Sequence, residues 1–343
     1  AGWKADSTIE LAAEVSKPKG SEEELQKVKD VLGTFSTKYA SSASGRKANI
    51  ANGSKKINGS VIYPGEEFSV YQTVAPFNAD NGYKLAGAYE NGTTVDAYGG
   101  GICQVSTTLY NAVIRAELEV TERSGHSMIV NYVDPSADAA IAGEYKDFKF
   151  KNSTDAPIYI ESYANGTTIS FTIYGQETRP ANRSISFVSE TLSTTDPGVK
   201  FQESSDAVGT ISKTQSSHVG KSARLWKVVT VDGVEESREV FNKTTYKASP
   251  TIYAVGVSSE NPEAVSAMKA AIATQDEGTI RAAAAQWKNA VQQPEQTTDP
   301  TQDPNAGQTQ PADGTNQNGQ TDNSAQQTPP ADNQSANQGT TAQ

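Results

Sequence analysis

A run of three glycines ahead of the single cysteine constrains this chain more than any other stretch of its sequence. Gly99, Gly100 and Gly101 lead through Ile102 into Cys103. Glycine has no Cβ, so this backbone can take positive φ angles and let another chain approach closely. The apolar residues that follow recur at helical spacing, at Val105, Leu109, Ala112, Val113 and Ala116. The pattern predicts a glycine turn that opens directly into a helix with one buried face.

The position of Cys103 at a helix start favours a reactive thiol. Free N–H groups and the helix dipole there favour an anion and can lower the pKa of a thiol. His126, one of two histidines in the chain, follows in the same glycine-marked block. A Cys–His hydrolase or acyltransferase needs a thiolate and an imidazole within reach. The sequence therefore predicts Cys103 as nucleophile and His126 as general base, whereas a small buried hydrophobe is the alternative for Cys103.

A third polar group would have to orient the imidazole ring, and the sequence alone does not choose one. We assign Asp138 to this role as a hypothesis; the other candidates are Asp96, Asp147 and Asn152. Backbone amides near Cys103 and Gln104 could stabilise an oxyanion, and the side-chain amide of Gln104 could add a donor. These residues make up the predicted catalytic site.

Recognition without catalysis is the alternative function for the same block. In this interpretation the glycines line a groove for a glycan or a peptide, and Arg123 pairs with a peptide carboxylate. Exposed tyrosines would stack on sugars, whereas buried ones would only supply core area. The residues predicted to contact a ligand are Gly99, Gly100, Gly101, Gln104, Ser106, Arg123 and Tyr83.

Short motifs on both sides of the glycine–cysteine run are similar to those of the VanW family, first met beside vancomycin-resistance genes in Gram-positive bacteria. The similarity covers residues 34–165. The motifs are Asn49-Ile50, Ile57-Asn58-Gly59, Pro64–Ser69, Asn81–Lys84, the glycine–cysteine run, Glu122-Arg123 with Gly125-His126, and Asp147–Asn152. The resemblance implies a cell-wall context and no established reaction. It makes peptidoglycan or its precursors the expected partner, at the extracellular, cell-wall or membrane-anchored surface of a Gram-positive bacterium.

A β-rich stretch further along resembles the G-five module of bacterial surface proteins. Gly220, Gly233 and Gly256 fall where that module places glycines. The resemblance implies adhesion to wall glycans, and a β spacer without a ligand is the alternative.

The expected fold class is α+β, with five parts along the chain. Residues 1–20 resemble the end of a preceding, peptidoglycan-binding-like domain. Residues 21–178 form the VanW-like domain with helices on a mainly antiparallel sheet, and 179–258 the small all-β module. Residues 259–292 form a helix. The last part, 293–343, is rich in Gln, Asn, Thr and Pro and is predicted to be disordered, because it buries too little apolar surface to offset ordering entropy.

Local patterns place the individual elements. We expect helices at 21–32, 46–60, 102–118 and 263–288, and strands at 83–89, 128–132, 148–151, 158–163, 168–174 and 221–245. Hairpin turns are expected at Asn91-Gly92, Asn165-Gly166 and Asp232-Gly233.

Composition excludes several classes of function. The formal net charge is −11, and no cluster of Lys and Arg forms a nucleic-acid footprint, so no nucleic-acid partner is expected. One cysteine and two histidines cannot build a Cys/His zinc site alone, and we expect no metal and no cofactor. No run reaches the ~20 apolar residues that span a bilayer. The abrupt start of the sequence predicts a piece of a longer protein, with membrane contact only through an anchor upstream.

Overall fold

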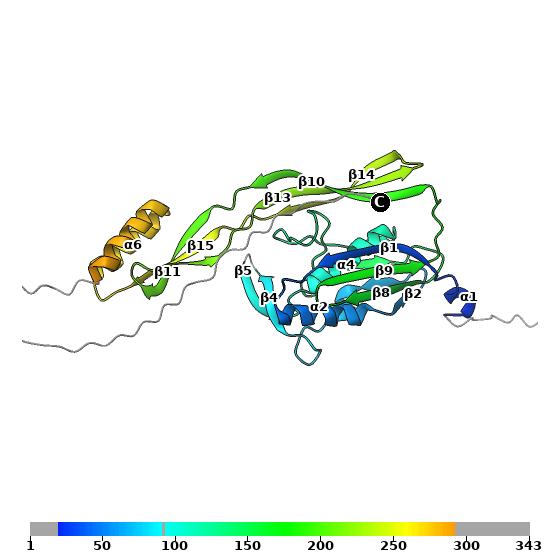
Figure 1. Ribbon diagram of the computed structural model, residues 1–343, viewed down its shortest axis with the longest axis horizontal. Helices are drawn as coiled ribbons and strands as arrows, with labels where there is room; N and C mark the ends of the chain where they lie inside the picture. The colour runs from blue at the N-terminus through cyan, green and yellow to red at the C-terminus, as the bar shows by residue number, and fades with distance from the viewer. Residues whose placement is uncertain (1–19, 91–92, 292–343) are drawn as a thin grey trace, which may run out of the picture. The chain divides into compact units, whose positions relative to one another are not determined.

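The computed structural model describes residues 20–90 and 93–291 (Figure 1). The expectations for a preceding domain, for the turn at Asn91-Gly92 and for a disordered tail from residue 293 lie outside the described residues, apart from Gly20. Among the described residues, no helix combines the length and the apolar character needed to cross a membrane.

An antiparallel sheet of four strands organises the first domain, in the order β1-β9-β8-β2. These strands are β1 (Asp30–Lys38), β9 (Thr168–Gly175), β8 (Ile158–Ala164) and β2 (Ser60–Ile62). Two helices, α2 (Ser44–Ile57) and α4 (Ile102–Arg115), pack on this sheet and on each other (Figure 1). Gly33 in β1 permits the close approach of α4, because a Cβ there would lie 2.4 Å from the carbonyl oxygen of Ala112.

Helix α4 is the centre of the domain core. All of its residues except Cys103 and Arg115 are buried. It packs among the large buried side chains of the sheet and of the β3-β7-β6 layer, including Phe148, Phe150 and Phe171. A helix buried on nearly every side holds its first turn rigidly, and that first turn carries the thiol.

Smaller elements surround this core. A second sheet has the order β3-β7-β6, and β4 pairs with β5 in a hairpin. Their bounds are β3 (Glu67–Ser69), β7 (Lys149–Lys151), β6 (Glu119–Glu122), β4 (Leu85–Glu90) and β5 (Thr93–Tyr98). Two short helices complete the domain, α1 (Glu22–Leu25) and α3 (Val70–Val74).

The following segment is built from long strands. One sheet has the order β10-β13-β14 and is antiparallel. A second has the order β11-β15-β12, in which β11 and β15 run parallel. The strands are β10 (Arg183–Thr195), β11 (Val199–Ala207), β12 (Ile211–Gln215), β13 (Gly220–Val231), β14 (Val234–Tyr246) and β15 (Thr251–Ser258).

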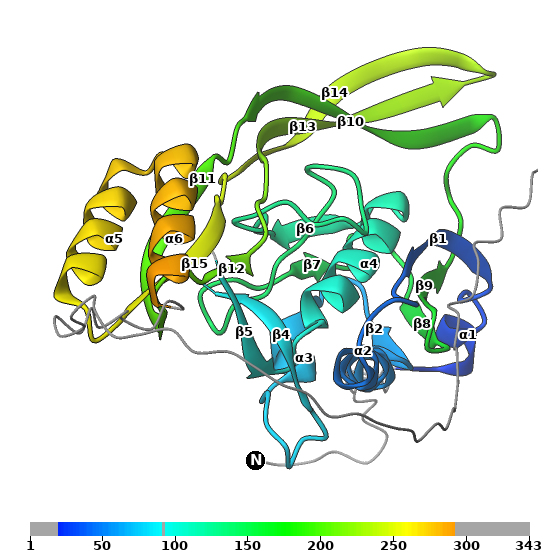
Figure 2. The same ribbon diagram turned by 60° about the vertical axis from the view of Figure 1, so that its left-hand side comes forward.

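Two helices close the described chain. Figure 2 shows α5 (Pro262–Thr274) and α6 (Glu277–Val291) side by side near β15. The predicted face of α5, with Ala264, Met268, Ala271 and Ile272, is buried against Phe201 and Val255 of the β-strands. These helices share one apolar core with the second sheet.

The α+β class with mainly antiparallel sheets is confirmed, and so are several local predictions. Helix α2 ends at Asn58-Gly59, where Gly59 has φ +89°. The hairpin turns at Asn165-Gly166 and Asp232-Gly233 join β8 to β9 and β13 to β14.

The predicted helix at 21–32 is wrong beyond its first turn. Helix α1 ends at Leu25, and residues 30–38 instead form β1. Strand β1 pairs with β9 from Asp30 to Lys38. Pairing with a distant strand overrides the local helical pattern, and neighbouring residues in the sequence give no sign of that pairing.

Two further predictions need correction. The single helix at 263–288 is two helices, because Gln275 takes a left-handed φ of +54° and Asp276 accepts a hydrogen bond from the Thr279 amide at 2.7 Å, starting a new helix. Residues 128–132 form no strand; they belong to an irregular segment before Asp134-Pro135, a pair that favours turns.

Candidate active site

The glycine turn places Cys103 at the open end of α4. Gly101 precedes the helix with φ +111°, and Gly99 has φ +82°, so both use backbone angles that other residues rarely adopt. Gly100 lies against the β4 backbone, where a Cβ would meet the carbonyl oxygen of Ala86 at 2.6 Å. The turn therefore fixes the helix start against the protein, and Cys103 remains partly exposed beside it.

His126 and Asp138 meet at this helix start. The His126 backbone amide donates to Asp138 Oδ2 at 2.7 Å, and the ring Nδ1 lies 2.6 Å from the same oxygen. The His126 imidazole lies close enough to Cys103 to lower the pKa of the thiol, and both side chains line one cavity. When protonated, the thiol can donate to the Ile141 carbonyl, 3.4 Å from Sγ. The structure thus brings together the three side chains assigned to catalysis.

The charges of these three groups support one another. Burial raises the pKa of Cys103, but the hydrogen bond and the charge of His126 outweigh it, and the net pKa lies below the usual thiol value. Burial lowers the pKa of His126, yet Asp138 and Cys103 together raise it to about 9. Burial raises the pKa of Asp138, while His126 and Arg123 bring it down to about 2. The arrangement therefore shifts all three groups towards their charged forms, which are a thiolate, an imidazolium and a carboxylate.

A buried network fixes Asp138, whose side chain is 0% exposed. Arg123 donates from Nε to the Asp138 carbonyl oxygen at 2.7 Å and from Nη2 to Oδ1 at 3.1 Å. Tyr246, from β14, donates its hydroxyl to Oδ1 and accepts from the Ser136 amide at 2.7 Å. Thr244 of the same strand accepts from Arg123 Nη1 at 3.1 Å. Strand β14, which belongs to the segment after the first domain, therefore helps to hold the Asp138 carboxylate in position.

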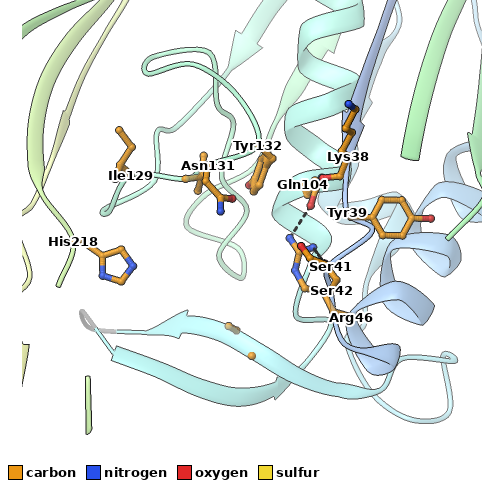
Figure 3. Close-up of a pocket in the computed structure, with 13 residues that line it drawn as sticks. Lys38, Tyr39, Ser41, Ser42, Arg46, Gln104, Ile129, Asn131, Tyr132 and His218 are labelled. Carbon is orange, nitrogen blue, oxygen red and sulfur yellow. Dashed lines mark hydrogen bonds between the residues drawn. The ribbon is translucent and has the colours of Figure 1, made fainter. Parts of the chain in front are cut away.

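Two adjoining cavities lie at this site. Cys103 and His126 line the thiol cavity, which has a volume of about 210 Å³. The larger neighbour, about 430 Å³ and here named the side cavity, contains Lys38, Arg46 and Tyr132 in its wall (Figure 3). Residues common to both walls are Arg46, Gly87, Ala88, Gln104, Val130 and Tyr132. A ligand extending from the thiol cavity would enter the side cavity.

Several residues predicted to bind a ligand lie elsewhere. Tyr83 is fully buried, and its hydroxyl donates to the Val74 carbonyl at 2.7 Å, so its predicted ligand contact is wrong. Ser106 is also fully buried, inside α4. Gly99 and Gly100 pack against Phe77 and Ala86 and line neither cavity. Gly101 lines the thiol cavity.

Gln104 and Arg123 lie at the site but bind the protein itself. The Gln104 backbone amide donates to the Gly101 carbonyl at 3.0 Å, and its side-chain amide donates to Thr37 and to the Lys38 carbonyl. Gln104 therefore offers no free donor to an oxyanion, contrary to expectation. Arg123 donates its hydrogen bonds to Asp138, Ser136 and Thr244 rather than to a ligand carboxylate.

The other candidates for orienting the imidazole have structural partners. Asp147 accepts from the Ser69 hydroxyl and from the Tyr71 amide. Asn152 donates to the carbonyls of Ile62 and Ala156, both at 2.9 Å. Asp96 lies in β5 and lines neither cavity.

Sequence reasoning missed Tyr132 as a site residue. Its hydroxyl lies 3.4 Å from His126 Nε2, and its side chain lines both cavities. Burial raises its pKa well above the usual tyrosine value, so the hydroxyl stays protonated and can donate. The turn signal at Asp134-Pro135 was the available sign that this segment folds back rather than continuing as a strand.

Among the described residues, no group of three or more His, Cys, Asp and Glu side chains is arranged to hold a metal ion. Asp138 faces two cations and a tyrosine hydroxyl, and Cys103 faces one imidazole. A carboxylate, an imidazole and a thiol placed in this order form an arrangement that can activate a thiol.

The chain is similar to known families in two regions. Residues 45–174 match the family described as VanW like protein, and residues 190–258 match the G5 domain. Both resemblances read from the sequence are thereby confirmed.

Two curated relatives share the first region. "Uncharacterized protein YoaR" of Bacillus subtilis (strain 168) is 38% identical over 146 residues, which is 43% of this chain and 48% of that protein. "Vancomycin B-type resistance protein VanW" of Enterococcus faecalis (strain ATCC 700802 / V583) is 32% identical over 118 residues, 33% of this chain and 42% of that protein. The chain spans less than half the length of each.

Two solved structures match about a fifth of the chain. The IgA1 protease G5 domain is 28% identical and covers 22% of this chain and 90% of its own, with a TM-score of 0.17. The HP0197 G5 structure is 21% identical and covers 22% of this chain and 95% of its own, with a TM-score of 0.13.

Proposed function

We propose that the VanW-like domain of this chain performs thiol-dependent acyl chemistry on peptidoglycan stem peptides or their precursors. The chain carries a VanW-like domain followed by a G5 domain, and this organisation indicates a cell-wall-associated protein. The observation that carries this proposal is the Cys103–His126–Asp138 arrangement, which opens onto a cavity. A thiolate, an imidazole and an orienting carboxylate are the parts that covalent acyl transfer requires.

In the proposed reaction, the Cys103 thiolate attacks the carbonyl carbon of a peptide bond in the stem. The carbon–nitrogen bond breaks, and the His126 imidazolium gives its proton to the departing amine. The acyl group remains on sulfur as a thioester. An amine or a water then attacks the thioester, His126 takes the proton of that attacking group, and the thiolate is restored. An amine makes the protein an acyltransferase, and water makes it a hydrolase.

The oxyanion of each tetrahedral intermediate has two candidate donors. The Cys103 backbone amide lies in the first turn of α4, where an amide has no carbonyl one turn earlier within the helix. The protonated hydroxyl of Tyr132 lies on the wall of the same cavity, within 3.4 Å of His126 Nε2. Donors fixed in place before the reaction stabilise the developing charge most effectively.

The G5 domain completes the proposal for location. We propose that it holds the protein against wall glycans at the extracellular surface of a Gram-positive cell, with the boundary of the VanW-like domain near residue 178 and the G5 module over 179–258. The β-rich build of the second segment, which presents long exposed strands such as β11 and β14, suits a surface module.

The rate of Cys103 alkylation tests the proposed thiol. With iodoacetamide, we expect fast modification near neutral pH, because the pKa of Cys103 lies below the usual value. His126→Ala should move the midpoint of the rate–pH curve upward towards that of an ordinary thiol. Tyr163→Phe, an exposed change on β8, is the matched control and should leave the curve unchanged.

Incubation with muropeptides tests the reaction itself. Intact-protein mass spectrometry should detect an acyl adduct on Cys103, and chromatography should detect the released amine, with both lost in Cys103→Ala. If alkylation is slow and independent of His126, and no adduct forms while the protein still sediments with purified peptidoglycan, the result supports wall recognition without catalysis. That result would overturn the catalytic proposal.

A further inference from the structure

The side cavity has a cationic wall in an acidic protein. Lys38 and Arg46 line it, and Lys146 lines the adjoining thiol cavity. Neither wall contains an Asp or Glu, although the whole chain carries a formal net charge of −11. Positive groups without acidic neighbours favour an anionic ligand, because the cavity walls weaken solvent screening between them.

Arg46 stands where the two cavities join. Its Nη1 donates to Ser42 Oγ and its Nη2 donates to Gln104 Oε1, both at 2.7 Å. Among the described residues it has no carboxylate partner. A guanidinium has five N–H donors, so two neutral acceptors leave several free. Figure 3 shows the Arg46 side chain reaching Gln104 in the cavity wall.

Gln104 fixes the orientation of this guanidinium. Its side chain is buried at 1% exposure, and its amide nitrogen donates to Thr37 Oγ1 at 2.9 Å and to the Lys38 carbonyl at 3.0 Å. The amide oxygen must then face Arg46. A buried amide with every group committed holds the cation in place, whereas a surface arginine would sample many positions.

The comparison with Arg123 strengthens the assignment. Arg123 was the sequence candidate for holding a ligand carboxylate, but Asp138 and two neighbouring oxygens take its donors. Arg46 sits instead on a cavity wall with neutral partners only. The two arginines divide the tasks: one orients the catalytic carboxylate, and the other has donors free for a ligand.

From these observations we infer that Arg46 forms a carboxylate-binding subsite beside the thiol. The preferred ligand is a peptide that carries a free carboxylate close to the bond attacked by Cys103. This inference rests on the proposed function for the peptide nature of the substrate, whereas the cationic subsite rests on the cavity alone. A planar guanidinium can bind a carboxylate through two parallel hydrogen bonds.

Binding to Cys103→Ala protein separates recognition from turnover. The probes are a stem peptide with its free carboxylates, the same peptide with those carboxylates amidated, and a glycerol-phosphate oligomer. Calorimetry should show the free peptide binding at least tenfold more tightly than the amidated one. Adding Arg46→Gln should reduce that preference to less than threefold, and Arg46→Lys should restore part of it.

A matched control addresses charge and folding. Lys55→Gln removes one positive charge from the exposed face of the same helix and should leave the preference unchanged. Equal affinity for free and amidated peptides overturns the subsite, as does loss of the preference in Lys55→Gln. Tighter binding of the phosphate oligomer than of either peptide overturns the carboxylate assignment. Intact binding preference without any acyl adduct in the wild type overturns the proposed function and leaves the subsite standing.

Discussion

Two carboxylates in this molecule are held at nearly the same low pKa, yet their surroundings differ. Asp138 and Glu117 each have a pKa of about 2, after burial is outweighed by partners. Glu117 binds Arg183 of β10 and Lys227 of β13, with Lys227 Nζ 2.8 Å from Oε1. Asp138 binds Tyr246 of β14 and the ring of His126. Both carboxylates join the first domain to the strands that follow it.

The difference lies in what each carboxylate faces on its other side. The partners of Glu117 are cations with no further chemistry, and its side chain keeps 16% of its surface exposed. Asp138 is fully buried, and its partner His126 continues to a thiol and a cavity. A low pKa shows only that a carboxylate is well paired. Whether that carboxylate has a structural or a catalytic role depends on what its partner residue contacts in turn. A substitution at Asp138 should therefore mainly lower activity, whereas a substitution at Glu117 should mainly lower stability.

The largest expected effect is that of Cys103→Ala. Removing the nucleophile should lower the rate of acyl transfer by a factor on the order of 10⁵ or more, as in other covalent acyl enzymes. The free energy of unfolding should change little, because Cys103 is one of two α4 residues that are not buried. Adduct formation with muropeptides measures the first, and urea unfolding the second. Glu117→Gln is the contrasting control and should keep the adduct.

Asp138→Asn should come next. Loss of the carboxylate lets the pKa of His126 fall from about 9 towards its usual value, and the amide can hold the wrong tautomer of the ring. Turnover should drop by a factor on the order of 10³. The thiolate loses its cationic partner at neutral pH, so the midpoint of the alkylation rate should shift to higher pH. An unchanged midpoint would mean that Asp138 acts only as a structural residue.

The thiol and the imidazole of the site could be predicted from the sequence, but the residues that surround them could not. Cys103 at a glycine turn and His126 nearby follow local patterns of chemistry, and both reach the same cavity. The choice of Asp138 over Asp147 could not be made locally, because it depends on where an irregular segment crosses the start of α4. Tyr132 was missed for the same reason.

The same limit explains the errors in the fold. Helix α2 and the hairpins could be predicted from nearby residues, because glycine and asparagine or aspartate mark their ends. Strand β1 exists only because β9, more than a hundred residues later, pairs with it. Tyr83 was named as a residue that contacts a ligand, although the core encloses it entirely. Long-range contacts decided each of these.

Glu117→Gln should affect stability and spare the chemistry. Because the folded pKa of Glu117 is about 2 and the usual value is 4.5, its ion pairs stabilise the fold above pH 4.5 and lose this contribution as pH falls towards 2. The substitution should lower the free energy of unfolding at pH 7 by about 2 kcal/mol, a figure reduced for partial exposure. The difference from wild type should shrink between pH 4.5 and 2. Urea titrations across that range measure it, and a pH-independent difference would contradict the assignment.

The smallest expected effect tests whether the second domain serves the site of the first. Tyr246→Phe removes the hydrogen bond to Asp138 Oδ1 and the acceptor for the Ser136 amide, and leaves the ring in place. A hydrogen bond to a charged group contributes about 1.5–3 kcal/mol, part of which the Arg123 guanidinium retains here. Turnover should fall about tenfold, and the alkylation midpoint should rise slightly because Asp138 orients His126 less well. Tyr163→Phe again supplies the control. Should Tyr246→Phe lower only the free energy of unfolding, with the alkylation curve unmoved, then Tyr246 resembles Arg183 at Glu117, a fastening between domains and nothing more.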